Sequence, residues 1–100
     1  MTDRIVETID ADLEVLIPSF MGNTMTEIVG LENALKSADF NMLGLLGHNI
    51  KGSALNYGFA VLAEIGRGIE LAAGVEDLAR IEALIADLKD YIGRVEVRFK

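Results

Sequence analysis

Residues 41–58 read NMLGLLGHNIKGSALNYG, with apolar positions at the three- and four-residue spacing of an α-helix. On a helical wheel of about 100° per residue, one side is mostly apolar, and we expect it to face the core. His48, the only histidine of the chain, falls on the opposite side. The apolar side consists of Met42, Leu43, Leu46, Ile50, Ser53, Ala54 and Tyr57, and the side of His48 of Asn41, Gly44, Leu45, Lys51, Gly52 and Leu55.

Capping residues set the expected limits of this helix and of the two that follow it. Asp39 is an N-cap for a helix over 40–57, and Gly58 closes that helix. Residues 59–73 repeat the helical period, with Gly74 at the position of a C-cap. The last apolar stripe predicts a long helix from about Val75 to near the end of the chain.

The amino-terminal third predicts one more main helix and a short additional one. A helix is expected over roughly 11–35, and Pro18 either kinks it or marks its true start. Ile5, Val6 and Ile9 suit a short helix before it. Because the connections are short, neighbouring helices should be antiparallel. We therefore expect an all-α fold, an antiparallel up-and-down four-helix bundle with a short extra N-terminal helix, as one domain over 1–100.

Composition restricts the class of protein. With 100 residues, 51% of them hydrophobic and 25% charged, the chain is typical of one soluble globular domain. It has no cysteine, which excludes disulfides and thiolate metal sites, and its net charge of −7 argues against binding to nucleic acid. No segment predicts a membrane span or a secretory signal, so we expect a cytoplasmic protein.

Glycines surround His48 on the predicted helix. Gly44 and Gly52 lie one turn before and one turn after it, and Gly47 precedes it directly. Each glycine inside a helix costs about 1 kcal/mol relative to alanine, so three of them call for a compensating use. Because Gly44 and Gly52 have no side chains, they would leave a bare flank on each side of the imidazole, and another protein could approach the ring closely. Gly47 can instead serve tight packing between helices.

The residue types near His48 indicate which kind of site its imidazole could form. Lys51, one turn further on the same side, can interact with an anionic group on the imidazole, although it can also be an ordinary surface lysine. No neighbour at helical spacing is a good metal ligand, so we expect no metal. The helix also offers no carboxylate to orient the ring, which argues against a catalytic triad. A phosphate acceptor that depends on a partner for the rest of the chemistry fits these residues best.

The run His48-Asn-Ile-Lys51-Gly52-Ser53, followed by Gly58, resembles the signature of histidine-containing phosphotransfer (HPt) domains. The continuation Tyr57-Gly58-Phe59, Leu62, Gly66 and Glu70-Leu71-Ala72-Ala73 is similar to free-standing members of that family. The resemblance extends over residues 41–73 at the level of individual residues.

The resemblance implies a role for each matching residue. His48 would carry the phosphoryl group, Lys51 would supply a nearby positive charge, and Gly52 would leave space for the partner. Ser53 would support packing or hydrogen bonding. Gly44 and Gly47 depart from the alanine or arginine expected there in many members, so the supporting role of Gly44 rests on its place on the helical wheel. The outward apolar residues Leu45 and Leu55 are candidates for docking to the partner.

The expected function is that of a phosphocarrier without its own ATP site, in a multistep two-component phosphorelay. It would accept the group from a receiver-domain aspartyl phosphate and pass it to another receiver. Its partners would be response-regulator receivers and a hybrid histidine kinase; no cofactor is expected, since the magnesium ion would belong to the receiver. We expect a monomer. Two alternatives remain open: the phosphoacceptor domain of a chemotaxis-type histidine kinase, and a non-catalytic adaptor bundle.

Overall fold

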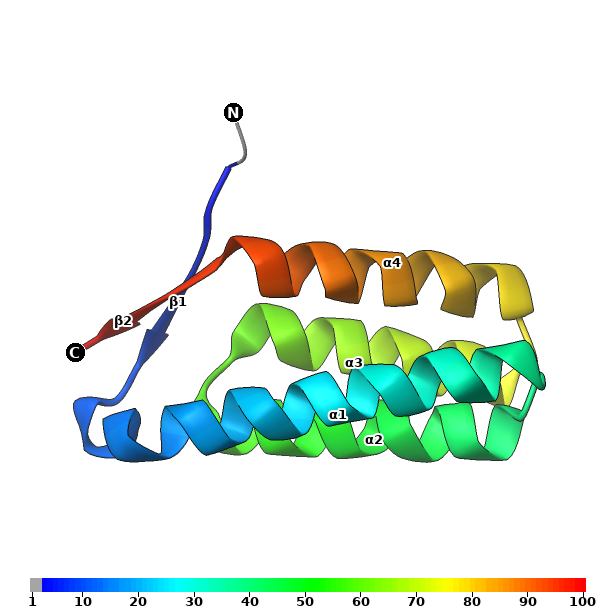
Figure 1. Ribbon diagram of the computed structural model, residues 1–100, viewed down its shortest axis with the longest axis horizontal. Helices are drawn as coiled ribbons and strands as arrows, with labels where there is room; N and C mark the ends of the chain where they lie inside the picture. Colours follow the sequence, from blue (N-terminus) through cyan, green and yellow to red (C-terminus); the bar gives the residue numbers. More distant parts are fainter. Residues whose placement is uncertain (1–2) are drawn as a thin grey trace.

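Four antiparallel helices form the body of the protein in the computed structural model, which describes residues 3–100 (Figure 1). The predicted all-α up-and-down bundle is therefore confirmed. A two-stranded parallel sheet lies at one end, where α1 begins and α2 ends. The elements are β1 (Ile5–Ile9), a 3₁₀ segment (Ala11–Leu16), α1 (Ile17–Lys36), α2 (Phe40–Tyr57), α3 (Ala60–Gly74), α4 (Leu78–Arg94) and β2 (Val95–Phe99).

Helix α2 has the limits that its caps predict. The Asp39 carboxylate accepts a hydrogen bond from the Met42 N–H at 3.0 Å. Gly58 follows the last turn in the left-handed region, with φ of 89°, and its N–H donates to the carbonyl of Ala54 at 2.9 Å. Glycine adopts this conformation without the penalty that a Cβ would bring. Both ends of the helix that carries His48 are thus determined locally.

Other predicted boundaries need correction. Residues 11–16 form a 3₁₀ segment, and α1 begins at Ile17 with Pro18 in its first turn, so Pro18 marks the start of the helix rather than a kink. Gly74 is the last residue of α3, and Val75 is the C-cap. Helix α4 begins at Leu78 because Asp77 caps it, the carboxylate accepting from the Arg80 N–H at 3.0 Å.

The short N-terminal helix expected through Ile5, Val6 and Ile9 is wrong, because this segment is strand β1. It pairs in parallel with β2, from Ile5 opposite Val95 to Ile9 opposite Phe99. The last helix consequently ends at Arg94 rather than near the chain end. Side chains alternate between buried and exposed along residues 6–9, and β-branched residues suit such a half-buried strand. Its partner lies at the far end of the chain, which no local pattern reveals.

Glu7 connects this sheet to the amino terminus of α3. Its side chain is buried, with 3% of the residue exposed. Its Oε2 accepts hydrogen bonds from the N–H of Val61 at 3.1 Å, the N–H of Leu62 at 3.3 Å and the hydroxyl of Tyr91 at 2.9 Å. Helix α3 has no side-chain cap from Phe59, so Glu7 satisfies donors that would otherwise lack partners. Burial, and then the hydrogen bond to Glu7, raise the pKa of Tyr91 above its usual range.

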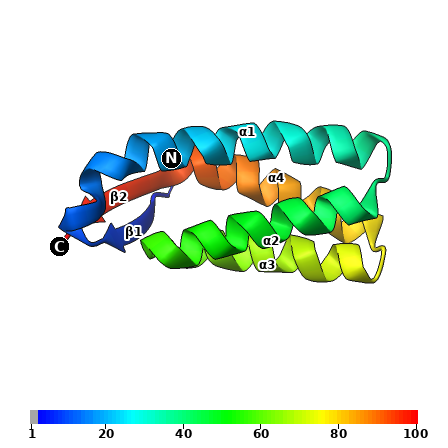
Figure 2. The same ribbon diagram turned by 90° about the horizontal axis from the view of Figure 1, so that it is seen from below.

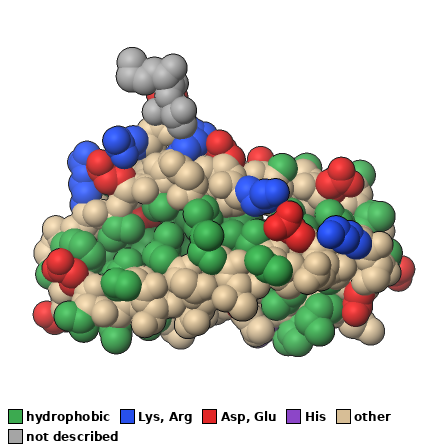
Figure 3. Space-filling model, in the orientation of Figure 1, with side chains coloured by type: hydrophobic (Ala, Val, Ile, Leu, Met, Phe, Trp, Pro, Cys, Tyr) green, Lys and Arg blue, Asp and Glu red, His purple; other side chains and the backbone are tan. Residues whose placement is uncertain are grey.

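The helices enclose a single core, and part of the outer surface is apolar. On the α1 and α4 side, apolar side chains show between the two helices, and no histidine is visible there (Figure 3). No helix among residues 3–100 is long and apolar enough to cross a membrane. On α2, Leu43, Ile50 and Ala54 are buried as predicted.

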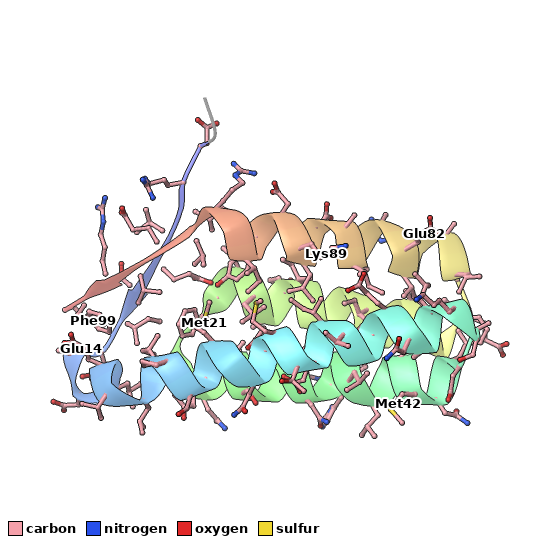
Figure 4. All side chains as sticks on the ribbon, in the orientation of Figure 1. Glu14, Met21, Met42, Glu82, Lys89 and Phe99 are labelled. Atoms are coloured by element: carbon pink, nitrogen blue, oxygen red, sulfur yellow. The ribbon has the colours of Figure 1, made fainter. Side chains whose placement is uncertain are left out.

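Two members of the predicted core face of α2 are exposed instead. Met42 points away from the bundle near the start of α2 (Figure 4), and Ser53 lies at the surface. Both lie at one margin of the apolar stripe on the helical wheel.

Candidate functional site

His48 lies near the middle of α2, with 59% of its side chain exposed. It faces away from the core, as the helical wheel predicts. Two open hollows meet at its ring, one on the side of α1 and one on the side of α3. The first is lined by Asn23, Thr26, Glu27, Asn49, Gly52 and Ser53, and the second by Phe40, Asn41, Gly44, Leu45, Glu70, Ala73, Gly74 and Glu76.

A carboxylate from the neighbouring helix contacts the imidazole. Oε2 of Glu70, on α3, lies 2.8 Å from Nδ1 of His48. The other carboxylate oxygen, Oε1, accepts a hydrogen bond from Nζ of Lys51 at 2.6 Å. His48, Lys51 and Glu70 therefore form one connected polar group at the surface between α2 and α3.

This arrangement selects the reactive nitrogen of His48. An ionised carboxylate can only accept a hydrogen bond, so Nδ1 must carry the proton in the pair with Glu70. In the neutral imidazole, Nε2 then holds the lone pair. Among residues 3–100, Nδ1 has this protein partner and Nε2 has none. In the neutral ring, Nε2 is thus the nitrogen that is available to another molecule.

Two glycines bring α2 and α3 close enough for these contacts. A Cβ on Gly47 would lie 2.8 Å from the backbone nitrogen of Glu70 and 2.9 Å from the carbonyl oxygen of Gly66. A Cβ on Gly66 would lie 2.7 Å from the backbone nitrogen of Lys51. The two helices run side by side here (Figure 2). Gly47 is therefore a packing residue, and the close approach places Glu70 beside both His48 and Lys51.

The charges of the group keep Glu70 ionised. Its hydrogen bond to Lys51, and then its hydrogen bond to His48, lower the pKa of the Glu70 carboxyl. Lys51 is partly buried, with 28% of its side chain exposed, which makes it more than an unconstrained surface lysine. As expected, α2 itself offers His48 no carboxylate, but Glu70 reaches the ring from α3.

The other predicted site residues lie around His48 in different settings. Gly52 has open space where a Cβ would be, which agrees with its predicted bare flank. Gly44 is less open, since a Cβ there would be 3.5 Å from the Cβ of Ala73, an ordinary contact. Ser53 is exposed and lines the hollow on the α1 side, so it does not support the core packing expected of it. Leu45 and Leu55 are 52% and 63% exposed.

Glu27, Glu70 and Glu76 are acidic residues that line the two hollows beside His48, and the sequence assigned no role to them. Glu70 stands in the stretch that resembles the HPt family, four residues after Gly66, and this spacing was the available signal. Glu27 lines the hollow on the α1 side, where partial burial raises the pKa of its carboxyl. In the part of the chain that the structure describes, no three side chains of metal-ligating type come together.

The imidazole of His48 lies at an open surface rather than in an enclosed cavity. The imidazole has a defined proton position, a neighbouring cation and open space on two sides. Its surroundings are open to solvent.

Comparison with known proteins agrees with this description. A family model described as Hpt domain matches residues 15–97, nearly the whole chain. Searches among curated proteins and among solved structures found no match. Hpt domains are phosphocarrier modules that act in phosphorelays together with receiver domains and histidine kinases. The family match covers nearly the whole chain, and the structure is a four-helix bundle. The chain therefore belongs to the Hpt domain family.

Proposed function

We propose that this protein carries a phosphoryl group on Nε2 of His48, between the aspartates of two receiver domains. The observation that carries the proposal is the contact between Nδ1 of His48 and Glu70, which leaves Nε2 free and nucleophilic at an exposed surface. The protein acts as a phosphocarrier, without its own ATP site, and a partner supplies the remaining groups of the reaction.

In the accepting step, the Nε2 lone pair attacks the phosphorus of an aspartyl phosphate. The bond from phosphorus to the aspartate oxygen breaks as the N–P bond forms, and the aspartate leaves as a carboxylate. The proton on Nδ1 stays in place, so the ring becomes positively charged, and the carboxylate of Glu70 stabilises this charge at a 2.8 Å contact. Transfer to the second receiver is the reverse of these events.

The surroundings of His48 suit a partner's active site. Lys51 adds a positive charge on the same side of α2, next to the position of the phosphoryl group. Gly52 leaves the next turn bare, so the receiver can approach along the helix. Leu45 and Leu55, which lie before and after the histidine, would contact apolar residues of the receiver. The receiver would bring the magnesium ion and position its aspartate in line with Nε2.

Incubation with a phosphorylated receiver domain and magnesium tests the proposal. The wild-type protein should take up an acid-labile, base-stable label, while His48→Gln should take up none, because His48 is the only histidine. A parallel incubation with a kinase catalytic domain and ATP shows whether the donor is a kinase instead. Equal label on His48→Gln and wild type, or no label from any receiver of the same organism, would contradict the proposal.

A further inference from the structure

The sheet formed by β1 and β2 is small, and its outer strand edges have no partner strand among residues 3–100. It consists of β1 and β2 alone, paired in parallel over five residues each. One face of this pair packs against the core of the bundle, through Ile9, Val95 and Val97, whereas parallel strands normally lie inside larger sheets. The outer edge of β2 therefore calls for an explanation.

The backbone N–H and C=O groups of successive β2 residues point alternately toward β1 and away from it. Lys100, just after the strand, donates its N–H to the carbonyl of Ile9 and accepts from the N–H of Ala11, both at 3.1 Å. In a parallel ladder the residues that face the partner strand alternate, so the backbone groups of Glu96 and Arg98 also point to β1. Those of Val97 and Phe99 point the other way. Beyond the ladder, no backbone partner for either residue exists among residues 3–100.

The side chains along this edge are self-complementary. Strand β2 reads VEVRF, with Val97 at its centre, Glu96 before it and Arg98 after it. Within one chain Glu96 already pairs with Arg98 at 2.7 Å. If a second β2 runs antiparallel and Val97 faces Val97, each Glu96 also lies opposite the Arg98 of the other copy. Each Val95 then lies opposite a Phe99. Opposite charges and paired apolar residues across antiparallel strands are both favourable.

We propose that β2 pairs with β2 of a second copy of this chain, antiparallel and about a two-fold axis at Val97. The outward N–H and C=O of Val97 then bond to those of the other Val97, and the two sheets join into one of four strands. Phe99, which is 39% exposed at the tip of β2 (Figure 4), gains an apolar neighbour in Val95 of the second copy. The proposed dimer differs from the monomer expected from the sequence.

The outer edge of β1 does not offer the same match. An antiparallel pair of β1 strands centred on Glu7 would place two carboxylates opposite each other, and Glu7 is already used by α3 and Tyr91. Other registers of β2 are also unfavourable. A pair centred on Glu96 or on Arg98 would place like charges directly opposite each other. Charge thus favours the β2 register centred on Val97 over those centred on Glu96 or Arg98.

The proposed contact leaves the phosphoryl-carrying face open. The sheet lies at the end of the bundle where α2 finishes at Tyr57. His48 is nine residues earlier, about 14 Å along the helix axis at 1.5 Å per residue. Each copy in the dimer could therefore meet its own receiver.

Charge substitutions test the register. Analytical ultracentrifugation of the wild type over a concentration series should show twice the 10.8 kDa of one chain. Glu96→Arg alone would set two arginines opposite each other, and Arg98→Glu alone would set two glutamates opposite each other. Each single variant should bind its own copy at least 10-fold more weakly than the wild type. An equimolar mixture of the two variants should form a heterodimer, because every facing pair is then of opposite charge.

Proline substitutions test the edge itself. Val97→Pro removes an N–H that points away from β1, so the intrachain ladder keeps its hydrogen bonds while the dimer loses two. Thr8→Pro is the matched control, because the N–H of Thr8 points to the outer edge of β1. We expect the first variant to be monomeric and the second to dimerise as the wild type does, with circular dichroism confirming that both are folded.

The following results would each contradict the proposed contact between two β2 strands. A wild type that stays at 10.8 kDa up to millimolar concentration would overturn the proposal. So would single charge variants that dimerise as the wild type does, or a mass that keeps rising past the dimer. Phosphoryl uptake on His48 is a separate measurement, so loss of one property does not imply loss of the other.

Discussion

Nδ1 of His48 lies 2.8 Å from Oε2 of Glu70, although the two residues are 22 positions apart in the chain. This contact makes Glu70 the positioning residue of the candidate site, because it holds the ring and defines its proton. Removing the carboxylate should therefore affect the reaction rather than the fold.

Glu70→Ala should slow phosphoryl uptake from a receiver by about 10- to 100-fold. This corresponds to the ~1.5–3 kcal/mol that a hydrogen bond to a charged group contributes. Glu70→Gln should be intermediate, because the amide oxygen can still accept from Nδ1. Nitrogen-15 NMR of the imidazole gives an independent check, since the preference for a proton on Nδ1 should disappear in Glu70→Ala. An unchanged tautomer and rate would remove the role assigned to Glu70.

The Glu70 carboxyl should titrate below its ordinary value of 4.5, because Lys51 and His48 stabilise the ionised form. With a lowered pKa in the folded state, the stabilising contribution of this carboxylate is present above its unfolded-state pKa. That contribution is lost as the pH falls through the folded-state pKa. Carbon-13 NMR of the side chain measures the midpoint directly.

The Lys51 hydrogen bond is the larger cause of the lowered pKa, so Lys51→Met should raise the midpoint more than His48→Gln does. If His48→Gln raised the midpoint of Glu70 more than Lys51→Met, the hydrogen bond to His48 would be the larger cause of the lowered pKa, contrary to this prediction.

Gly47→Ala should destabilise the protein by roughly 1–3 kcal/mol, because the added methyl group would meet backbone atoms of α3 at under 3 Å. Gly44→Ala is the matched variant on the same helix. Its methyl group would make an ordinary contact with Ala73, and helix propensity should stabilise the protein by up to about 1 kcal/mol. Urea denaturation of both variants measures the free energies of unfolding. Equal effects at the two positions would contradict the close helix contact.

Gly52→Gln should slow phosphotransfer while the bundle remains folded, since the new side chain would enter the space that the receiver needs. Gly93→Gln is the control on α4, where a Cβ also meets nothing within 4 Å. Both variants should have similar melting temperatures, and only the first should be slow. The comparison is made on initial rates with the same phosphorylated receiver.

Glu7→Ala should lower the free energy of unfolding by about 2–4 kcal/mol, because it leaves two N–H groups of α3 and the buried Tyr91 hydroxyl without an acceptor. Tyr91→Phe should cost only about 1 kcal/mol, since it removes one donor and keeps the ring. Glu82→Ala, at an exposed position of α4, should change stability by less than about 0.5 kcal/mol. Thermal and urea denaturation measure all three.

Local patterns predicted the helices because the signals lie within a few residues of each other. Asp39 and Gly58 delimit α2 through hydrogen bonds to their near neighbours, so both ends can be found in the sequence. The outward position of His48 follows from the helical period alone. The start of α4 was predicted three residues early, at Val75 rather than Leu78, although Asp77 is itself a local cap.

Long-range contacts decided the rest. Residues 5–9 have side chains that suit either a short helix or a strand, and pairing with 95–99 selects the strand. Glu70 belongs to a stretch that resembles the HPt family, yet its contact with His48 depends on how closely α2 and α3 pack. That distance is determined by Gly47 and Gly66 together.

The sequence by itself determined the helical bundle, the exposure of His48 and the resemblance to phosphotransfer domains, because each depends on spacing along the chain. Only the tertiary structure determined which nitrogen of His48 is free and which strand edge of β2 is open. Both depend on groups far apart in sequence, Glu70 for the nitrogen and β1 for the edge. Hydrogen bonds act over about 3 Å, so these partners could be identified only after the backbone brought them together.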